Sequence, residues 1–253
     1  MTFDRRRYGV DNYVYLLAEG DDAVLVDPGD PDVAMALAQA HGARPRFVLH
    51  THGHADHTGG TAEVAALLGA TVYGSAADGT WYPPDVDVSG RRDLELGGLR
   101  VRVHEVPGHT PGSILYEWKG RLLTGDTLFW GGAGNCRHGG DPGLLADSFQ
   151  SVIARLDGAL EVNPGHDYAE TNLSFALDLE PSNAAARAQI EAARGAHSRR
   201  EEPKPTTLEG ERGSNPFLRA ADLIPVLARR GVSCRGARDA FLAIRRLKDA
   251  WRG

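Results

Sequence analysis

The stretch THGHADHTGG, residues 51–60, constrains this chain more than any other feature. It places three histidines and one aspartate, His52, His54, Asp56 and His57, within six positions. Imidazole and carboxylate side chains without a thiolate suit zinc, iron or manganese. His52 and His54 are two positions apart and cannot share one face of a helix, so a loop or an extended segment must present them. We expect a metal-binding loop at the end of the strand RFVLHT.

Three further segments repeat this arrangement of an apolar strand, a glycine and a candidate ligand. His109 follows LRVRVHEV, Asp126 follows RLLT, and His166 follows LEVN. Loops at strand ends lie along one edge of a sheet, where residues distant in sequence can meet. The predicted metal ligands are His52, His54, Asp56, His57, His109, Asp126 and His166.

Seven ligands suit two metal ions rather than one. Asp56 and His57 are adjacent and point in different directions, which favours a second metal beside the first, and Asp126 is a candidate bridging carboxylate. Two metals about 3.5–4 Å apart can polarise a carbonyl and supply hydroxide at neutral pH. The pattern predicts a hydrolase. The other five histidines lack this context and are expected to be solvated or hydrogen-bonding; they are His41, His50, His104, His138 and His197.

The order of the segments predicts an α/β fold followed by a helical part. Short β-rich runs alternate with helical stretches up to Tyr168, and helical spacing dominates afterwards. Composition alone predicts a linker at EPKPTTLEGERGSNP, residues 202–216, because it is charged and rich in proline. Gly59 and Gly60 are expected to let the chain turn tightly into the helix that begins near residue 61.

Composition excludes several classes of protein. There is no run of about 18 apolar residues, so no membrane span is expected. The formal net charge of -6 argues against nonspecific nucleic-acid binding. Cys136 and Cys234 form no CxxC motif, so a disulfide framework is not expected and a cytoplasmic location fits. The start of the chain is interpreted as mature sequence rather than a signal peptide.

The motifs THGHADH, PGHTPGS, TGDTLF and PGHDY resemble the metallo-β-lactamase superfamily in order and spacing. The later segments PGHDYAETNLSFAL, PTTLEGERGSNPFLR and AFLAIRRLKDAW are similar to its glyoxalase II (hydroxyacylglutathione hydrolase) branch. The resemblance covers nearly the whole chain. It implies a four-layer αβ/βα sandwich with a C-terminal helical domain: a catalytic domain over residues 1–168 and a helical substrate-binding domain over residues 169–253.

The resemblance also implies roles for the ligands. His52, His54 and His109 would bind the first metal, Asp56, His57 and His166 the second, and Asp126 would bridge them. The implied reaction is hydrolysis of S-(2-hydroxyacyl)glutathione, or a similar acyl-thiol, to a hydroxy acid and a free thiol by a metal-bridging hydroxide. Asp56 would also orient this hydroxide. Asp27 resembles a residue that holds a metal ligand in place, although an aspartate before a proline also forms turns.

The resemblance also implies some of the substrate-binding residues. Tyr168, Arg245 and Lys248 match positions that hold glutathione, and the two cations suit a carboxylate. The segment GNCRHGG departs from the pattern: Asn135, Arg137 and His138 stand where the branch usually has a basic residue, an aromatic residue and a glutamate. Asn135 and Arg137 remain candidate substrate contacts, and the identity of the thiol stays open.

Other functions remain as alternatives. A persulfide dioxygenase with one iron would use the first-site histidines and Asp126 and would need oxygen. A lactonase or β-lactamase would keep the metals without the helical tail, and a non-catalytic binding module would lose ligands. We expect a monomer that acts on a small-molecule thioester with two divalent metals, whose identity (zinc, iron or manganese) depends on availability.

Overall fold

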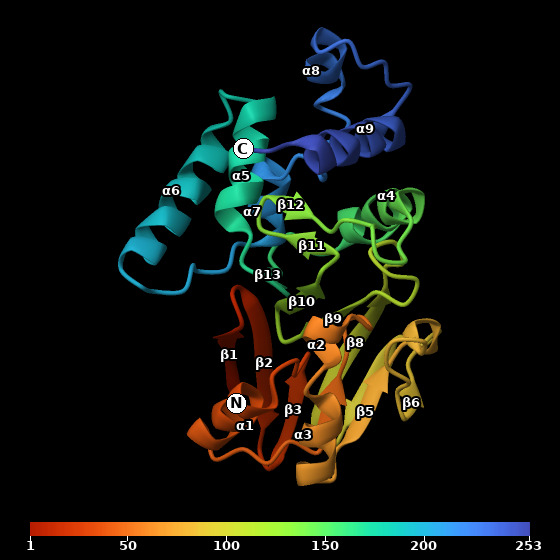
Figure 1. Cartoon of the computed structure of the whole chain (residues 1–253), viewed down its shortest axis with the longest axis vertical. Coiled ribbons are helices and arrows are strands. Elements are labelled where there is room, and N and C mark those ends of the chain that lie inside the picture. Colours follow the sequence, from red (N-terminus) through yellow and green to blue (C-terminus); the bar gives the residue numbers. More distant parts are fainter.

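The computed structural model describes residues 1–253, and two β-sheets form its centre (Figure 1). The first sheet has the strand order β1-β2-β3-β4-β5-β6. Its strands are β1 (Thr2–Tyr8), β2 (Asn12–Glu19), β3 (Asp22–Val26), β4 (Phe47–Leu49), β5 (Thr71–Gly74) and β6 (Val86–Asp87). The pairs β1/β2 and β2/β3 are antiparallel, whereas β3 to β6 run parallel. Parallel pairing requires crossovers, and helices supply the first two.

The second sheet has the order β13-β10-β9-β8-β7, and a short hairpin stands beside it. Its strands are β7 (Asp93–Leu96), β8 (Leu99–Glu105), β9 (Ile114–Trp118), β10 (Arg121–Gly125) and β13 (Glu161–Pro164), and the hairpin consists of β11 (Leu128–Phe129) and β12 (Gly132–Ala133). Along β8, buried Leu99, Val101 and Val103 alternate with exposed Arg100 and Arg102. This period of two places one face on the core and the other in solvent.

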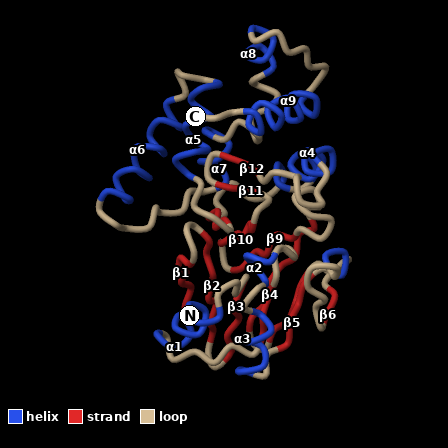
Figure 2. The backbone as a smooth tube through the Cα atoms, viewed as in Figure 1, coloured by secondary structure: helices blue, strands red, loops and turns tan.

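Nine α-helices surround the sheets, and those after β13 gather at one end of the molecule (Figure 2). They are α1 (Pro31–Ala40), α2 (Ala55–Thr58), α3 (Thr61–Leu68), α4 (Pro142–Ser151), α5 (Ala169–Leu179), α6 (Ala184–Ser198), α7 (Leu208–Ser214), α8 (Ile224–Arg229) and α9 (Ala237–Ala250), with 3-10 turns at Ala76–Asp78 and Ile153–Arg155. The α/β class and the C-terminal helical region are as predicted. None of these helices combines the length and apolar character needed to cross a membrane.

Two hydrophobic clusters hold the layers together. The smaller cluster packs Leu37 of α1 and Val64 of α3 against Leu16 and Leu25 of the first sheet. The larger cluster fills the space between the sheets and continues into α4–α7 and α9. The sandwich and the C-terminal helices therefore share one core, so the helical part is firmly attached to the strands that carry the candidate ligands.

The predicted linker over residues 202–216 is wrong. This segment contains α7, which Thr207 caps by accepting a hydrogen bond from the Gly210 amide. The Glu211 carboxylate is fully buried and accepts bonds from Thr206 Oγ1, Gly131 N and Asn215 Nδ2. Composition predicted a linker because charged residues are exposed in most contexts. Glu211 is buried instead, because residues distant in the sequence supply its hydrogen bonds.

Gly59 and Gly60 form the expected turn between α2 and α3, but not because glycine alone can adopt their backbone angles. Both residues have negative φ angles, -58° and -90°, that any residue can adopt. A side chain would instead collide with backbone, because a Cβ on Gly59 would lie 2.7 Å from Ala55 O and one on Gly60 would lie 2.5 Å from Pro28 O. These glycines permit close packing of α2 and α3 against the Pro28–Pro31 loop.

Candidate metal centre

Strand ends deliver all seven predicted ligands to one place. His52, His54, Asp56 and His57 follow β4, the last two on the single-turn helix α2. The other three lie in the loop between β8 and β9, at the end of β10 and at the end of β13; they are His109, Asp126 and His166. The bridge between Asn12 and His166 joins the two sheets at this point.

One group of candidate ligands consists of His52, His54 and His109. Their nitrogens all lie within 4.8 Å of one another, and His54 Nδ1 is 3.1 Å from His109 Nε2. The ring centroids are 4.8 Å apart for each pair, at angles of 79° to 87°. Three imidazoles converging in this way can bind one metal ion.

A second group consists of Asp56, His57 and His166. His57 Nε2 and His166 Nε2 are 3.1 Å apart, and Asp56 Oδ2 lies 3.3 Å from the latter. Asp126 stands between the groups: its carboxylate lies 3.4 Å from His57 Nε2 and from His166 Nε2, and 3.6 Å from His109 Nε2. A carboxylate in this position can contact both groups at once.

Two carboxylates fix the orientation of the histidines in the second group. Asp27 Oδ2 accepts a hydrogen bond from His57 Nδ1 at 3.1 Å, and Asp11 Oδ1 accepts one from His166 Nδ1 at 2.8 Å. Because a carboxylate only accepts, each Nδ1 carries the proton and each Nε2 is left to face its group. Asp27 also accepts from the amide and hydroxyl of Thr51, so it holds a candidate ligand as the resemblance implied.

Backbone carbonyls orient two histidines of the first group. His109 Nδ1 donates to Asn135 O at 2.7 Å, and His54 Nε2 donates to His138 O at 3.0 Å. Both carbonyls belong to GNCRHGG, the segment whose side chains depart from the family pattern. The unusual residues of this segment differ from the family pattern in their side chains. Because His54 and His109 contact only backbone carbonyls of the segment, these two hydrogen bonds do not require particular side chains there.

Sequence reasoning missed three contributors from the start of the chain. Tyr8 OH donates to the Asp56 carbonyl at 2.6 Å, and Asn12 Nδ2 donates to Asp56 Oδ2 at 3.1 Å. Asp11 binds His166, as described above. The polar pair Asp11-Asn12 before the apolar strand YVYLL was the available signal, since the other strands present ligands at their ends in the same way.

The charges of the centre are strongly coupled. Burial alone would raise the pKa of Asp126, but His57 and His166 hold it well below its usual range. Burial would lower the pKa of His166, but Asp126 and Asp56 raise it to about 10. His52 has its pKa lowered by burial and by its histidine neighbours. The centre thus favours ionised carboxylates beside positive charge, which divalent cations supply.

Two buried atoms without hydrogen-bond partners fit metal binding directly. His52 Nε2 and Asp126 Oδ1 are both buried and have no partner in the protein. Most buried polar atoms are paired, so such atoms require an explanation. Both belong to predicted ligands and lie where the two groups meet. Gly165 keeps this space free, because a Cβ there would collide with Asp126 Oδ1.

The predicted substrate residues lie on the side of the centre that faces the C-terminal helices. The Tyr168 ring stacks on His166 with centroids 4.8 Å apart and planes at 8°. Lys248 is half-buried between Phe175 and Trp251, 5.2 Å and 4.6 Å from their ring centroids. Burial, with Arg245 nearby, lowers the pKa of Lys248 to about 8.

The other candidates make contacts within the protein. Arg245 is buried, donates to the carbonyls of Ala133 and Gly134, and pairs with Asp249 at 2.8 Å. Arg137 donates to the Asp249 carbonyl, and the Asn135 side chain accepts from the Arg137 amide. These contacts hold α9 against the segment that orients His54 and His109. Because Arg245 is buried in these contacts, its helix face is not solvated at this position.

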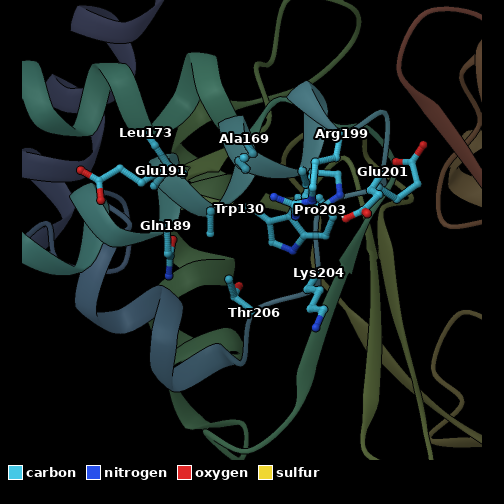
Figure 3. Close-up of a pocket in the computed structure, with 15 residues that line it drawn as sticks. Trp130, Ala169, Leu173, Gln189, Glu191, Arg199, Glu201, Pro203, Lys204 and Thr206 are labelled. Carbon is cyan, nitrogen blue, oxygen red and sulfur yellow. Dashed lines mark hydrogen bonds and ion pairs between the residues drawn. The ribbon is translucent and has the colours of Figure 1, made fainter.

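A cavity of about 370 Å³ lies away from the ligands, between α5, α6 and residues 199–206. Figure 3 shows Trp130 at its centre, with Arg199, Glu201 and Lys204 around it. None of the seven candidate ligands lines this cavity. Trp130 Nε1 donates to the Val162 carbonyl, which fixes the indole as part of the core rather than of the metal centre.

Comparison with known proteins agrees with this architecture. The metallo-β-lactamase superfamily model matches residues 7–166, and the model for the hydroxyacylglutathione hydrolase C-terminus matches residues 167–251. The crystal structure of ETHE1 from Myxococcus xanthus is similar, with a TM-score of 0.70 and 25% identity, covering 97% of this chain and 90% of that one. Fold and site thus define a metal-binding hydrolase of the metallo-β-lactamase superfamily.

Related sequences show to which family of this superfamily the chain belongs. The hydroxyacylglutathione hydrolase of Anaeromyxobacter dehalogenans is 64% identical over 98% of this chain and 99% of its own length. The cytoplasmic hydroxyacylglutathione hydrolase of Arabidopsis thaliana is 35% identical over 96% of each. The chain belongs to the hydroxyacylglutathione hydrolase family. It is a hydrolase that acts on a thioester, as the resemblance predicted.

Proposed function

We propose that this enzyme hydrolyses S-(2-hydroxyacyl)glutathione with a centre of two divalent metals. The observation that carries the proposal is the position of Asp126 between two separate ligand groups, within 3.6 Å of His57, His109 and His166. The names of the full-length relatives support the substrate class. A similar structure, that of TTHA1623, is of a di-iron-bound form, with a TM-score of 0.60 and 27% identity over 82% of this chain and 95% of that one.

The ligand assignment follows from the two groups. His52, His54 and His109 would hold one metal, and Asp126 would contact both. Asp56, His57 and His166 would hold the other. When bound, two such metals polarise a carbonyl and lower the pKa of water so that it can attack. The donor set contains nitrogen and oxygen only, which suits zinc, iron or manganese.

Asp56 is the residue best placed to orient the attacking water. Its side chain is 51% exposed, whereas the other members of its group are buried. Asn12 and Tyr8 hold the Asp56 side chain and backbone from the protein side, so its position is fixed while part of the carboxylate faces solvent. In the net reaction a C–O bond forms and the C–S bond breaks. Water supplies hydroxide to the acid and a proton to the thiolate.

The thiol part of the substrate is proposed to lie toward Tyr168 and Lys248. Tyr168 stacks on a predicted ligand. Lys248 on α9 donates to the carbonyl of Thr171, three residues after Tyr168, which places a cation near the start of α5. Arg245, Arg137 and Asn135 are proposed to contribute at the same side, chiefly by holding α9 against the ligand-orienting segment. Glutathione carries two carboxylates, so a cation at this position suits it.

We propose that residues 1–168 perform the chemistry and residues 169–253 hold the substrate. Two separate family models, which match residues 7–166 and 167–251, support this division. All seven candidate ligands come from one chain, so the site needs no residue of a second subunit, and we propose that the enzyme acts as a monomer. The name of the Arabidopsis relative supports a cytoplasmic location.

Metal content and thiol release test the proposal together. The purified enzyme should contain about two metals per chain and release thiol from S-lactoylglutathione. Removal of metal with a chelator should abolish release, and zinc, iron or manganese should restore it. One iron per chain with oxygen uptake on glutathione persulfide, and no thiol release, would overturn the proposal in favour of a dioxygenase.

A further inference from the structure

A single exposed aromatic side chain, Trp81, stands beside His54 of the first ligand group, whereas Tyr168 stacks on His166 of the second group. Trp81 is 42% exposed and is the one aromatic residue among the exposed large hydrophobic side chains, the others being Met1, Val10, Leu67 and Leu144. Its ring centroid lies 5.5 Å from that of His54, at 80°. Tryptophan is enriched at binding surfaces, because its large ring offers much apolar contact area.

Hydrogen bonds anchor the backbone of Trp81 beside the loops of the first ligand group. Its amide donates to the Asp78 carbonyl at 2.9 Å. The buried Asp78 carboxylate accepts bonds from Gly53 N at 2.9 Å, Thr110 Oγ1 at 2.7 Å and Gly112 N at 2.8 Å. Asp78 thereby ties the Trp81 loop to both loops that carry the first ligand group.

Glycines on two sides let the indole approach the ligands. A Cβ on Gly53 would lie 2.9 Å from Asp78 Cβ and 3.2 Å from Trp81 Cβ, and a Cβ on Gly139 would lie 2.7 Å from Trp81 Cη2. The absence of a side chain at both glycines leaves room for the tryptophan.

We propose that Trp81, with the Gly139 turn, forms the wall that contacts the acyl group of the substrate and sets acyl specificity. This inference rests on the proposed function. A thioester carbonyl placed near Asp126 has its sulfur and its acyl chain on opposite sides of the carbonyl carbon. If the thiol extends toward Lys248, the acyl chain extends toward His54 and Trp81. An apolar, uncharged ring there recognises the carbon chain of a 2-hydroxyacyl group.

The test compares acyl groups of increasing length on one thiol. Wild type, Trp81→Ala and Trp81→Phe are assayed with glycoloyl-, lactoyl- and 2-hydroxybutanoyl-glutathione, with Leu67→Ala as an exposed apolar control on α3. Trp81→Ala should lose up to about fourfold in kcat/KM for each added carbon, the equivalent of about 0.8 kcal/mol per buried methylene. Trp81→Phe should lose less, and Leu67→Ala should match wild type.

A binding measurement separates this inference from the proposed function. Glycolate, lactate and 2-hydroxybutanoate are titrated into the metal-loaded protein by calorimetry, without any thiol. Affinity that grows with chain length in wild type and is flat in Trp81→Ala supports the wall, even if no acylglutathione is hydrolysed and the proposed function fails. If Trp81→Ala loses affinity equally for all three acids, or loses none, the proposed role of Trp81 in acyl specificity is wrong.

Discussion

Replacement of Asp27 by asparagine should weaken metal binding without disturbing the backbone. Asp27 is buried and has a φ of 52°, in the left-handed region that asparagine also tolerates. Its carboxylate accepts three hydrogen bonds: from Thr51 N at 2.8 Å, from Thr51 Oγ1 at 2.6 Å and from His57 Nδ1 at 3.1 Å. Asparagine preserves the shape but replaces one acceptor oxygen with an NH2 group.

The size of the effect follows from the histidine proton. An amide nitrogen in place of Asp27 Oδ2 cannot accept from His57 Nδ1, so the proton moves to Nε2, the atom that faces the second ligand group. Binding a metal then requires restoring the other tautomer without its partner. A hydrogen bond to a charged group contributes about 1.5–3 kcal/mol, which corresponds to roughly 10- to 150-fold in affinity. The range agrees with the typical 10–100-fold cost of losing a residue that orients a metal ligand.

Competition with a chromophoric chelator measures this directly. One of two metals should bind roughly 10- to 150-fold more weakly in Asp27→Asn, and kcat should fall with occupancy and recover at excess metal. Asp30→Asn is the matched control on the same loop, because Asp30 caps α1 through Val33 N and asparagine caps equally well. Equal metal affinity in Asp27→Asn and wild type would refute the role assigned to the carboxylate.

Three further changes test other parts of the structure. His54→Ala should remove a first-group ligand and reduce kcat by more than about 100-fold, beyond the cost of an orienting residue; metal content should fall in parallel, and retention of both metals would contradict the assignment. Lys248 has its pKa lowered to about 8, so it is cationic below that pH and loses its charge above it. KM for a glutathione thioester should rise as pH passes 8, and Lys248→Arg should remove this rise. If KM of the wild-type enzyme does not change across this pH range, Lys248 does not bind a carboxylate of the substrate. Glu211→Ala removes the acceptor of the buried Gly131 amide and of Thr206 Oγ1, whereas Asn215 Nδ2 keeps the Phe129 and Gly132 carbonyls. It should lower the free energy of unfolding by about 2–4 kcal/mol in urea melts; a loss under 0.5 kcal/mol would show that the network contributes little.

Local chemistry made the clustering of the candidate ligands predictable from the sequence. Imidazole and carboxylate side chains beside glycines after apolar strands have few other uses, and the structure brings the seven such residues together. The helical tail was also predictable, because helical periodicity is a property of neighbouring residues. The matching segments around NPFLR and LKDAW then indicated the family.

The remaining features depend on contacts between residues far apart in the chain, which local patterns do not encode. Glu211 looked like part of a solvated linker until Gly131 and Asn215 paired with it. Arg245 was expected to bind a substrate carboxylate, but it is buried and donates to the carbonyls of Ala133 and Gly134. Trp81 lies 27 positions from His54 along the chain, and only the loops that Asp78 joins bring the two rings together.

The sequence by itself determined which atoms can bind metal, because ligand chemistry belongs to the residue type. Only the tertiary structure decided which nitrogen faces the centre in four of the five candidate histidines, since that depends on the acceptor opposite the other nitrogen. Those acceptors are Asp11, Asp27 and the carbonyls of Asn135 and His138. Two of the four are backbone atoms, whose positions follow from the path of the chain and from no side chain at those positions.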